Sequence, residues 1–269
     1  MNLAAEYDNR ARVPEHPEII ARWQRDAEAF RANRKAQFDC RYAARPRNIV
    51  DVFESGSTGP IVLFIHGGYW RSFDKSYFSH FASVPLQLGL TTAIPSYSLC
   101  PEVSVPDIID ELRQCCIWLH NTFKRPLVAA GHSAGGHLAA CLAATDWGQF
   151  GQTDDLVSGC LSISGLFDLR PLLAVPVNDD LKLDSLTAAA ASPLLWPLPF
   201  PKPLVSCVGA LESDEFKRQA ASLAAAWKGL GCDSTCFEIE SANHFTAIDA
   251  LNDPQSRLAT ELRRICDAS

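Results

Sequence analysis

The segment 131–135, with the sequence GHSAG, constrains this chain most because it joins two contrasting apolar runs. Residues 126–130 have the pattern of a buried strand, and residues 134–144 are small and apolar, as in a buried helix. Glycines on either side of a serine permit a sharp strand-to-helix turn that lifts the serine hydroxyl clear of a sheet. The pattern predicts that Ser133 is a nucleophile on such a turn. The alternative is a chance match in a Gly- and Ala-rich segment.

The rest of the chain alternates between strand-like and helix-like patterns. Apolar β-rich runs predict further strands over residues 48–53, 61–65, 90–94, 156–163, 204–208 and 234–239. Apolar residues at helical spacing predict helices over residues 77–88, 105–119 and 216–230, with a closing helix around 258–265. This order is typical of an α/β fold with a mostly parallel, doubly wound sheet. A chain of 269 residues can bury one large core, so we expect one domain over 1–269.

Two segments fall outside this alternation. Residues 1–45 form an N-terminal arm, in which apolar residues at helical spacing predict an amphipathic helix over 15–38. Residues 165–203 are rich in Leu, Ala and Pro and predict an irregular or helical insertion over the carboxyl edge of the sheet. Ligands of open α/β sheets bind at that edge, so the insertion is a candidate for a cap-like element. A long surface connection is the alternative interpretation.

Composition and charge narrow the class of partner. The chain has 24 Lys and Arg against 31 Asp and Glu, with no basic block, so a nucleic acid partner is not expected. Its 10 cysteines form no C-x-x-C pair, which argues against a disulfide scaffold or a metal site. Residues 1–12 are too polar for a signal peptide, and no apolar run has membrane-spanning length. We expect a cytoplasmic protein that acts on a small molecule; the sequence leaves a homodimer open.

A second glycine motif follows the predicted strand 61–65. Residues 66–70 have the sequence HGGYW, and a glycine pair at a strand end exposes backbone N–H groups that can bind an oxyanion. In serine hydrolases with this kind of turn, the second donor is the N–H after the nucleophile. The candidate oxyanion hole is therefore formed by Gly67, Gly68 and Ala134. An ordinary Gly-Gly turn is the alternative, and we interpret His66 as a structural hydrogen-bonding residue.

A serine nucleophile needs a base and an acid that orients the base. In α/β-hydrolase order both follow the serine, and His244 is the one later histidine in a loop after a predicted strand. The acid has three candidates after the strand 204–208. Glu215 fits a carboxylate at a helix start and Asp214 a helix cap, whereas Glu212 lies nearest the strand end. We favour Glu212, with Asp214 as the second choice.

With these motifs in place, the chain resembles the arylformamidase (kynurenine formamidase) branch of the α/β-hydrolases, which is related to the hormone-sensitive-lipase-like esterases. The HGGYW loop is similar to the H-G-G-x-W loop of that branch, and GHSAG is similar to its nucleophile turn. The resemblance covers nearly the whole chain. It extends to residues 6–10, 42–53, 164–172 and 178–179.

The resemblance implies hydrolysis of N-formyl-L-kynurenine to kynurenine and formate, a step of tryptophan catabolism, without a cofactor. It places the triad acid on Glu212, three residues after a glycine, although the family often has Asp there. The large side chains near the motifs are candidates for substrate binding: Tyr69, Trp70, Phe167 and Asn178. The runner-up is a short-chain carboxylesterase or another small amide hydrolase, and a non-catalytic binding protein of the same fold is the minor alternative.

Overall fold

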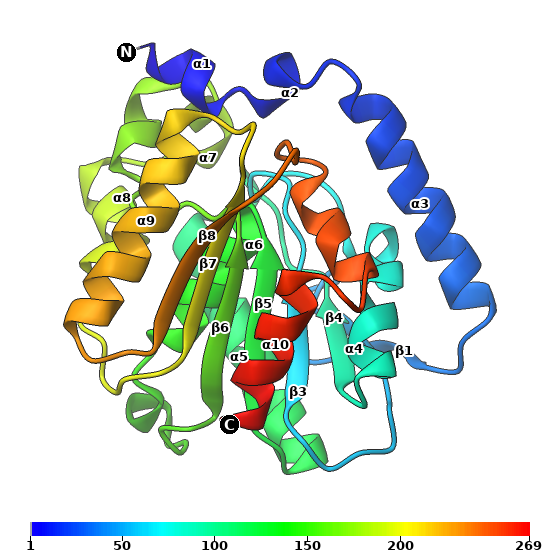
Figure 1. Cartoon of the computed structure of the whole chain (residues 1–269). Helices are drawn as coiled ribbons and strands as arrows, with labels where there is room; N and C mark the ends of the chain where they lie inside the picture. Colours follow the sequence, from blue (N-terminus) through cyan, green and yellow to red (C-terminus); the bar gives the residue numbers. More distant parts are fainter. Residues whose placement is uncertain (1) are drawn as a thin grey trace.

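The computed structural model describes residues 2–269 and builds them around one eight-stranded sheet (Figure 1). The strand order is β1-β2-β4-β3-β5-β6-β7-β8, antiparallel at the β1–β2 and β2–β4 pairs and parallel from β4 to β8. The predicted mostly parallel sheet is confirmed. The strands are β1 Gln37–Arg41, β2 Ile49–Phe53, β3 Ile61–Ile65, β4 Thr91–Pro95, β5 Leu127–His132, β6 Val157–Ile163, β7 Leu204–Gly209 and β8 Ser234–Ile239.

Helices cover both faces of the sheet, so its central strands are buried throughout. One core packs α5 (Val105–Phe123), α6 (Ala134–Ala143) and α9 (Asp214–Gly229) against the first face. The other core packs α3 (His16–Ala32) and α10 (Arg257–Asp267) against the second. Burial on both faces is the reason that these strands have continuous apolar sequences. The short helical elements are α1 Leu3–Tyr7, α2 Asn9–Arg12, α4 Ser83–Gln87, α7 Asn178–Leu181, α8 Ser185–Ala190, η1 Lys75–Tyr77, η2 Ser79–Ala82, η3 Trp147–Phe150, η4 Arg170–Ala174, η5 Pro193–Leu195 and η6 Ala247–Asn252.

Two local predictions differ from the structure. The helix predicted over residues 77–88 is broken into the 3-10 turns η1 and η2 followed by α4. Pro85 explains the break, because it has no N–H to donate and its ring clashes with the preceding turn of a continuous helix. The edge strand β1 was not predicted, since its side chains are mostly exposed and show no alternation.

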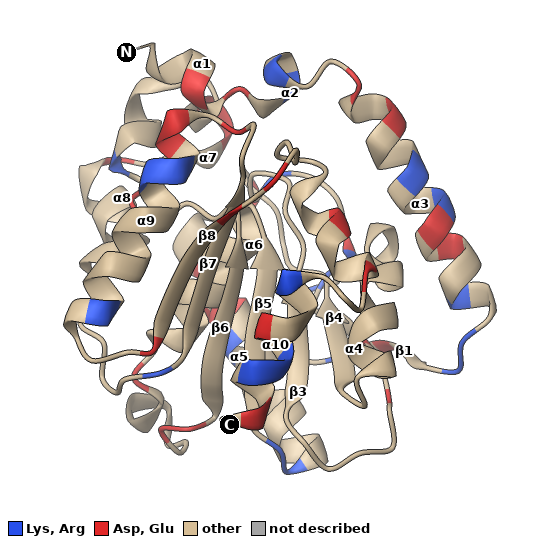
Figure 2. Ribbon diagram, viewed as in Figure 1, with Lys and Arg blue, Asp and Glu red and all other residues tan. Residues whose placement is uncertain are grey.

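The N-terminal arm crosses the carboxyl ends of the strands, from α1 beside α9 to α3 on the opposite side (Figure 1). The predicted amphipathic helix is present as α3, which ends at Ala32, earlier than expected. Its inner face buries Trp23 against Phe78, Phe81 and Phe245, and its outer face carries interspersed acidic and basic residues (Figure 2). The arm therefore roofs the edge of the sheet at which ligands of this fold class bind.

The segment 165–203 forms four short helical turns, η4, α7, α8 and η5, rather than one long element. His137 of α6 anchors its end, because the ring Nε2 lies 2.6 Å from the carbonyl oxygen of Ala191. A carbonyl only accepts, so Nε2 carries the proton of this neutral ring, whose pKa burial lowers to about 4. None of the helices described in residues 2–269 has the length and apolar character needed to cross a membrane.

Candidate active site

Three side chains that are distant in sequence meet at the carboxyl edge of the sheet. Ser133 follows β5, Glu212 follows β7 and His244 lies in the loop after β8. The Nε2 atom of His244 is 3.0 Å from the Oγ atom of Ser133, and its Nδ1 atom is 2.6 Å from a carboxylate oxygen of Glu212. The carboxylate accepts from Nδ1–H, which leaves Nε2 free to accept the serine proton. All three side chains are buried.

The turn at Ser133 requires its flanking glycines. The serine has a φ of +57°, and its N–H donates to the carbonyl of Ile163 across 2.8 Å. A Cβ on Gly131 would lie 2.2 Å from the carbonyl oxygen of Gly135, and a Cβ on Gly135 would lie 2.0 Å from that of Ile65. Backbone atoms cannot yield by that much, so only glycine fits at either position. The turn thus holds the serine in a conformation that non-glycine residues rarely adopt.

Glu212 is held by a set of donors that leaves one oxygen for the histidine. Its Oε1 atom accepts from the N–H of Gly209 at 2.7 Å and from the hydroxyl of Ser164, while Oε2 faces His244. Burial by itself would raise the pKa of Glu212, but the charge of His244 and these hydrogen bonds outweigh it, so the pKa is lowered. The side chain is therefore a carboxylate at neutral pH.

The other two candidate acids have different partners. Asp214 is the first residue of α9, directly after the N-cap residue Ser213. Glu215 accepts from the hydroxyl of Tyr7 at 2.6 Å and from the guanidinium of Arg218 at 2.7 Å. The structure places only Glu212 of the three in contact with His244.

His132 holds the histidine loop against the nucleophile turn. Its Nε2 atom is 2.8 Å from the carbonyl oxygen of His244, so Nε2–H donates to it. Burial, and then the nearby His244, lower the pKa of His132 to about 3 and keep the ring neutral. Neither His132 nor Ser164 was among the predicted site residues, although both lie at strand ends on this edge. Their position at strand ends was the one sequence feature that could have indicated a role at the site.

The glycine loop after β3 lies directly beside Ser133. A Cβ on Gly67 would come within 2.9 Å of the carbonyl oxygen of His132 and 3.0 Å of the Cβ of Ser133. Gly68 has a φ of +109°, and a Cβ there would lie 2.4 Å from the carbonyl oxygen of Ser72. Within residues 2–269, the N–H groups of Gly68 and Ala134 donate to no protein acceptor outside regular secondary structure. These groups remain available to an oxygen bound near Ser133.

His66 stabilises the backbone of this loop. Its Nδ1–H donates to the carbonyl of Gly67 at 2.8 Å, and its ring stacks on Tyr97 with centroids 4.3 Å apart. Burial lowers the pKa of His66 to about 4, so the ring is neutral. The structure gives His66 the hydrogen-bonding role expected from the sequence.

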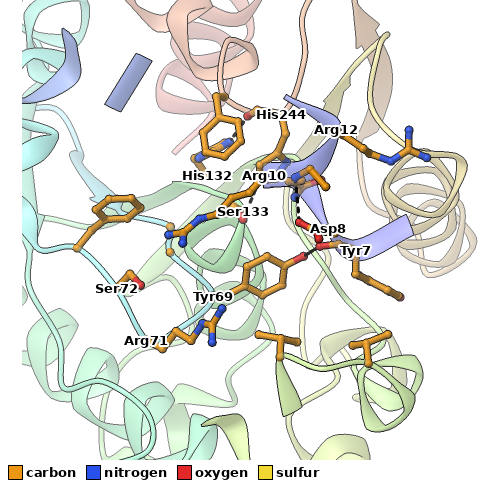
Figure 3. Close-up of a pocket in the computed structure, with 18 of the residues that line it drawn as sticks. Tyr7, Asp8, Arg10, Arg12, Tyr69, Arg71, Ser72, His132, Ser133 and His244 are labelled. Atoms are coloured by element: carbon orange, nitrogen blue, oxygen red, sulfur yellow. Dashed lines mark hydrogen bonds between the residues drawn. The ribbon is translucent and has the colours of Figure 1, made fainter. Parts of the chain in front are cut away.

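A cavity of about 520 Å³ opens above Ser133 and His244 (Figure 3). Its floor is the strand-end edge, and its roof is the N-terminal arm. Tyr69 joins the two, because it lines the cavity and its hydroxyl donates to the backbone carbonyl of Tyr7 at 2.6 Å. The arm and the 165–203 segment complete the wall with Ala4, Ala5, Tyr7, Asp8, Asn9, Arg10, Ala11, Arg12, Trp23, Val175, Pro176 and Val177. No cluster of potential metal ligands occurs among the residues that the structure describes.

Three of the four predicted substrate-binding residues do not line this cavity. Trp70 is fully buried, and its indole N–H donates to the Nδ1 atom of His137 at 3.3 Å. Phe167 is fully buried in the core under the 165–203 segment. The side-chain amide of Asn178 is engaged with the backbone of Leu183 at 2.8 and 3.0 Å. Trp70 and Phe167 are thus taken up by core packing and Asn178 by local hydrogen bonds, which places all three outside the cavity wall.

Comparisons with known proteins identify relatives of this chain. The family model BD-FAE matches residues 50–165. The kynurenine formamidase of Danio rerio is 29% identical over 246 residues, covering 87% of this chain and 83% of its own. That of Salmo salar is also 29% identical, over 82% of this chain and 78% of its own. A solved structure from Silicibacter sp. TM1040, provisionally described as a thioesterase, is 33% identical with a TM-score of 0.89, covering 98% of this chain and 99% of that one.

The chain is a homologue of the kynurenine formamidases and has an α/β-hydrolase fold. The relationship shows that the protein is a hydrolase. The match to the Silicibacter structure extends over both the arm and the 165–203 segment, since almost no residues of either chain remain uncovered. The arm is therefore a feature of this hydrolase fold and not a tail added to it.

Proposed function

We propose that this hydrolase cleaves small aryl formamides through Ser133, His244 and Glu212, with N-formyl-L-kynurenine as its principal substrate. The observation that carries the proposal is the continuous hydrogen-bonded path from Glu212 through His244 to Ser133, which ends at a cavity. A cavity of about 520 Å³ suits one small molecule. The relationship to the fish kynurenine formamidases supports the choice of a formamide bond.

The proposed reaction has two stages. Ser133 Oγ attacks the formyl carbon as its proton passes to Nε2 of His244, and the N–H groups of Gly67, Gly68 and Ala134 stabilise the oxyanion. The C–N bond then breaks, and the imidazolium of His244 donates its proton to the departing aromatic amine. Water, deprotonated by His244, hydrolyses the formyl ester and releases formate. The buried carboxylate of Glu212 stabilises the imidazolium in both stages.

The acyl group provides the test. We expect specificity constants to fall from formyl to acetyl to butyryl anilides, because methylene groups forced into a tight acyl site each cost about 1–3 kcal/mol. The measurement is kcat/KM for this series beside the matched phenyl esters. Faster cleavage of butyryl than of formyl derivatives would overturn the formamide assignment.

A second candidate is hydrolysis of short-chain esters or thioesters. It is favoured by one observation, the 33% identity over nearly the full length of the Silicibacter protein. A thiolate or phenolate leaves without needing the proton that an aromatic amine requires. Under this alternative, phenyl and thiophenyl acetates would be cleaved faster than formanilide by the same enzyme preparation.

A further inference from the structure

The N-terminal arm faces the side of the site from which the leaving group departs. Phe245, next to His244, stacks on His16 with centroids 5.5 Å apart and packs against Trp23 at 6.1 Å. In the proposed serine mechanism, His244 donates a proton to the leaving atom, so the leaving group must lie beside that ring. The arm lines the cavity beside His244 through Trp23 and residues 4–12, so in that mechanism the leaving group lies against the arm.

The arm and the glycine loop bring three arginines to the cavity wall, and two of them already have acidic partners. Arg12 forms an ion pair with Glu6 at 3.1 Å. Arg71 forms an ion pair with Asp180 of α7. Arg10 has no carboxylate within ion-pair distance in residues 2–269, although Asp8 is close in sequence and also lines the cavity. One cationic side chain of the wall is thus unneutralised.

The direction of these side chains separates them further. In Figure 3 the Arg10 side chain extends from the arm over the cavity toward Ser133, whereas Arg12 points away from it. Asp8 forms no ion pair with Arg10 in residues 2–269; one of its carboxylate oxygens accepts from the N–H of Ala11 at 3.0 Å and caps α2. The guanidinium of Arg10 is therefore free to bind a ligand in the cavity.

We propose that Arg10 binds a carboxylate carried by the leaving group, so that this hydrolase selects substrates whose amine or alcohol product is an acid. A guanidinium binds a carboxylate through two parallel hydrogen bonds, which fixes orientation as well as charge. The chain has a net charge of −7, which disfavours an anionic substrate unless a local cation offsets it. The inference rests on the proposed serine mechanism for the position of the leaving group, and not on the identity of the acyl group.

The test compares two substrates that differ only in that carboxylate: a 3-acyloxybenzoate and its methyl ester, with whichever acyl group the enzyme cleaves fastest. The quantity is the ratio of kcat/KM for the acid to kcat/KM for the methyl ester. We expect the enzyme to favour the acid about tenfold, the scale of one charge-assisted contact at a hydrated site. Raising the ionic strength should lower the ratio, because salt screens a partly exposed pair.

Variants decide whether Arg10 is responsible. Arg10→Met should bring the ratio close to one, and Arg10→Lys should keep part of it, since an ammonium retains the charge but not the paired hydrogen bonds. Arg25→Met is the matched control: Arg25 is an exposed arginine of α3 outside the cavity lining, so its loss changes net charge alone and should leave the ratio unchanged. Arg10 is exposed, so thermal unfolding should be unaffected in either Arg10 variant.

An unchanged ratio in Arg10→Met would overturn the proposal, as would an equal fall in Arg25→Met. The outcome is separate from that of the formamide assignment. If butyryl derivatives prove the better substrates and the acid preference still depends on Arg10, the formamide assignment fails and the carboxylate site stands. If formyl derivatives are preferred and the ratio is the same in Arg10→Met as in the parent, the formamide assignment stands and the carboxylate site fails.

Discussion

The strand-end edge and the N-terminal arm both line the cavity, but they are built in opposite ways. On the edge, Ser133, Glu212 and His244 are buried and hydrogen-bonded to one another, and Glu212 also accepts from the backbone N–H of Gly209. The arm consists of two short helices, α1 and α2, leading into α3, and most of its charged side chains are exposed.

We expect this difference to separate catalysis on the edge from substrate recognition by the arm. Each edge residue lies within a few residues of a strand end. Because the core fixes the positions of the strands, the side chains at these ends keep a constant geometry relative to one another. The arm packs Trp23 of α3 into the core, and its first helices are also held by hydrogen bonds from Tyr7 to Glu215 and from Tyr69 to the Tyr7 carbonyl. Four substitutions test whether the two regions are as distinct as this description requires.

The largest effect is expected for Ser133→Ala. Removing the nucleophile of a serine triad lowers turnover on the order of a million-fold. The missing hydroxyl makes no packing contact of consequence, so thermal unfolding should stay near that of the parent. The measurement is kcat on the best acyl substrate together with a melting curve. Retained acyl-enzyme burst kinetics in a folded variant would show that another residue is the nucleophile.

Glu212→Gln should be next. An amide keeps the size of the side chain but cannot stabilise the imidazolium and favours the wrong tautomer of His244, which costs roughly ten-thousand-fold in a comparable triad. Asp214→Asn is the matched control, because Asp214 begins α9 and does not contact His244. The comparison requires kcat for both variants. A larger loss in Asp214→Asn would move the acid to that position.

Ser164→Ala tests the support of the triad acid. The serine hydroxyl donates to the oxygen of Glu212 that does not face His244, and losing a bond to a charged group costs about 1.5–3 kcal/mol. We expect a tenfold to hundredfold fall in kcat on the same basis. The pKa of Glu212 is lowered partly by this bond, so its removal raises that pKa, and the infrared carboxylate band of Glu212 should be lost at a higher pH than in the parent. A fall in kcat with an unchanged Glu212 titration would indicate a purely structural role.

The smallest effect is expected in the arm, from Tyr7→Phe. The lost hydroxyl donates to Glu215, which keeps its hydrogen bonds from Arg218, so unfolding should be easier by only about 1 kcal/mol. Because Tyr7 lines the cavity, we expect KM to rise severalfold while kcat changes little. Steady-state kinetics separate the two constants. A fall in kcat comparable to that of Ser164→Ala would mean that the arm takes part in catalysis and that the two regions are not distinct.

Much of the fold follows from local patterns in the sequence. Apolar runs and helical spacing located seven of the eight strands and the long helices, because burial on one or both faces imposes a period that short segments show by themselves. The exception, β1, is an exposed edge strand, where burial imposes no period. The GHSAG turn was also recognisable locally, since the crowding at Gly131 comes from Gly135 in the same turn, whereas the crowding at Gly135 comes from Ile65 at the end of β3.

The sequence by itself determined the order of strands, turns and helices, and with it the strand ends on which a serine, an acid and a histidine would lie. Tertiary structure decided the rest. It brought Glu212, and not Asp214, into contact with His244, because the donors of Gly209 and Ser164 hold that carboxylate there while Asp214 begins α9. It also placed Arg10 in the cavity wall and buried Trp70 in the core, outside that wall. Those choices depend on contacts between segments far apart in the chain, which no local period encodes.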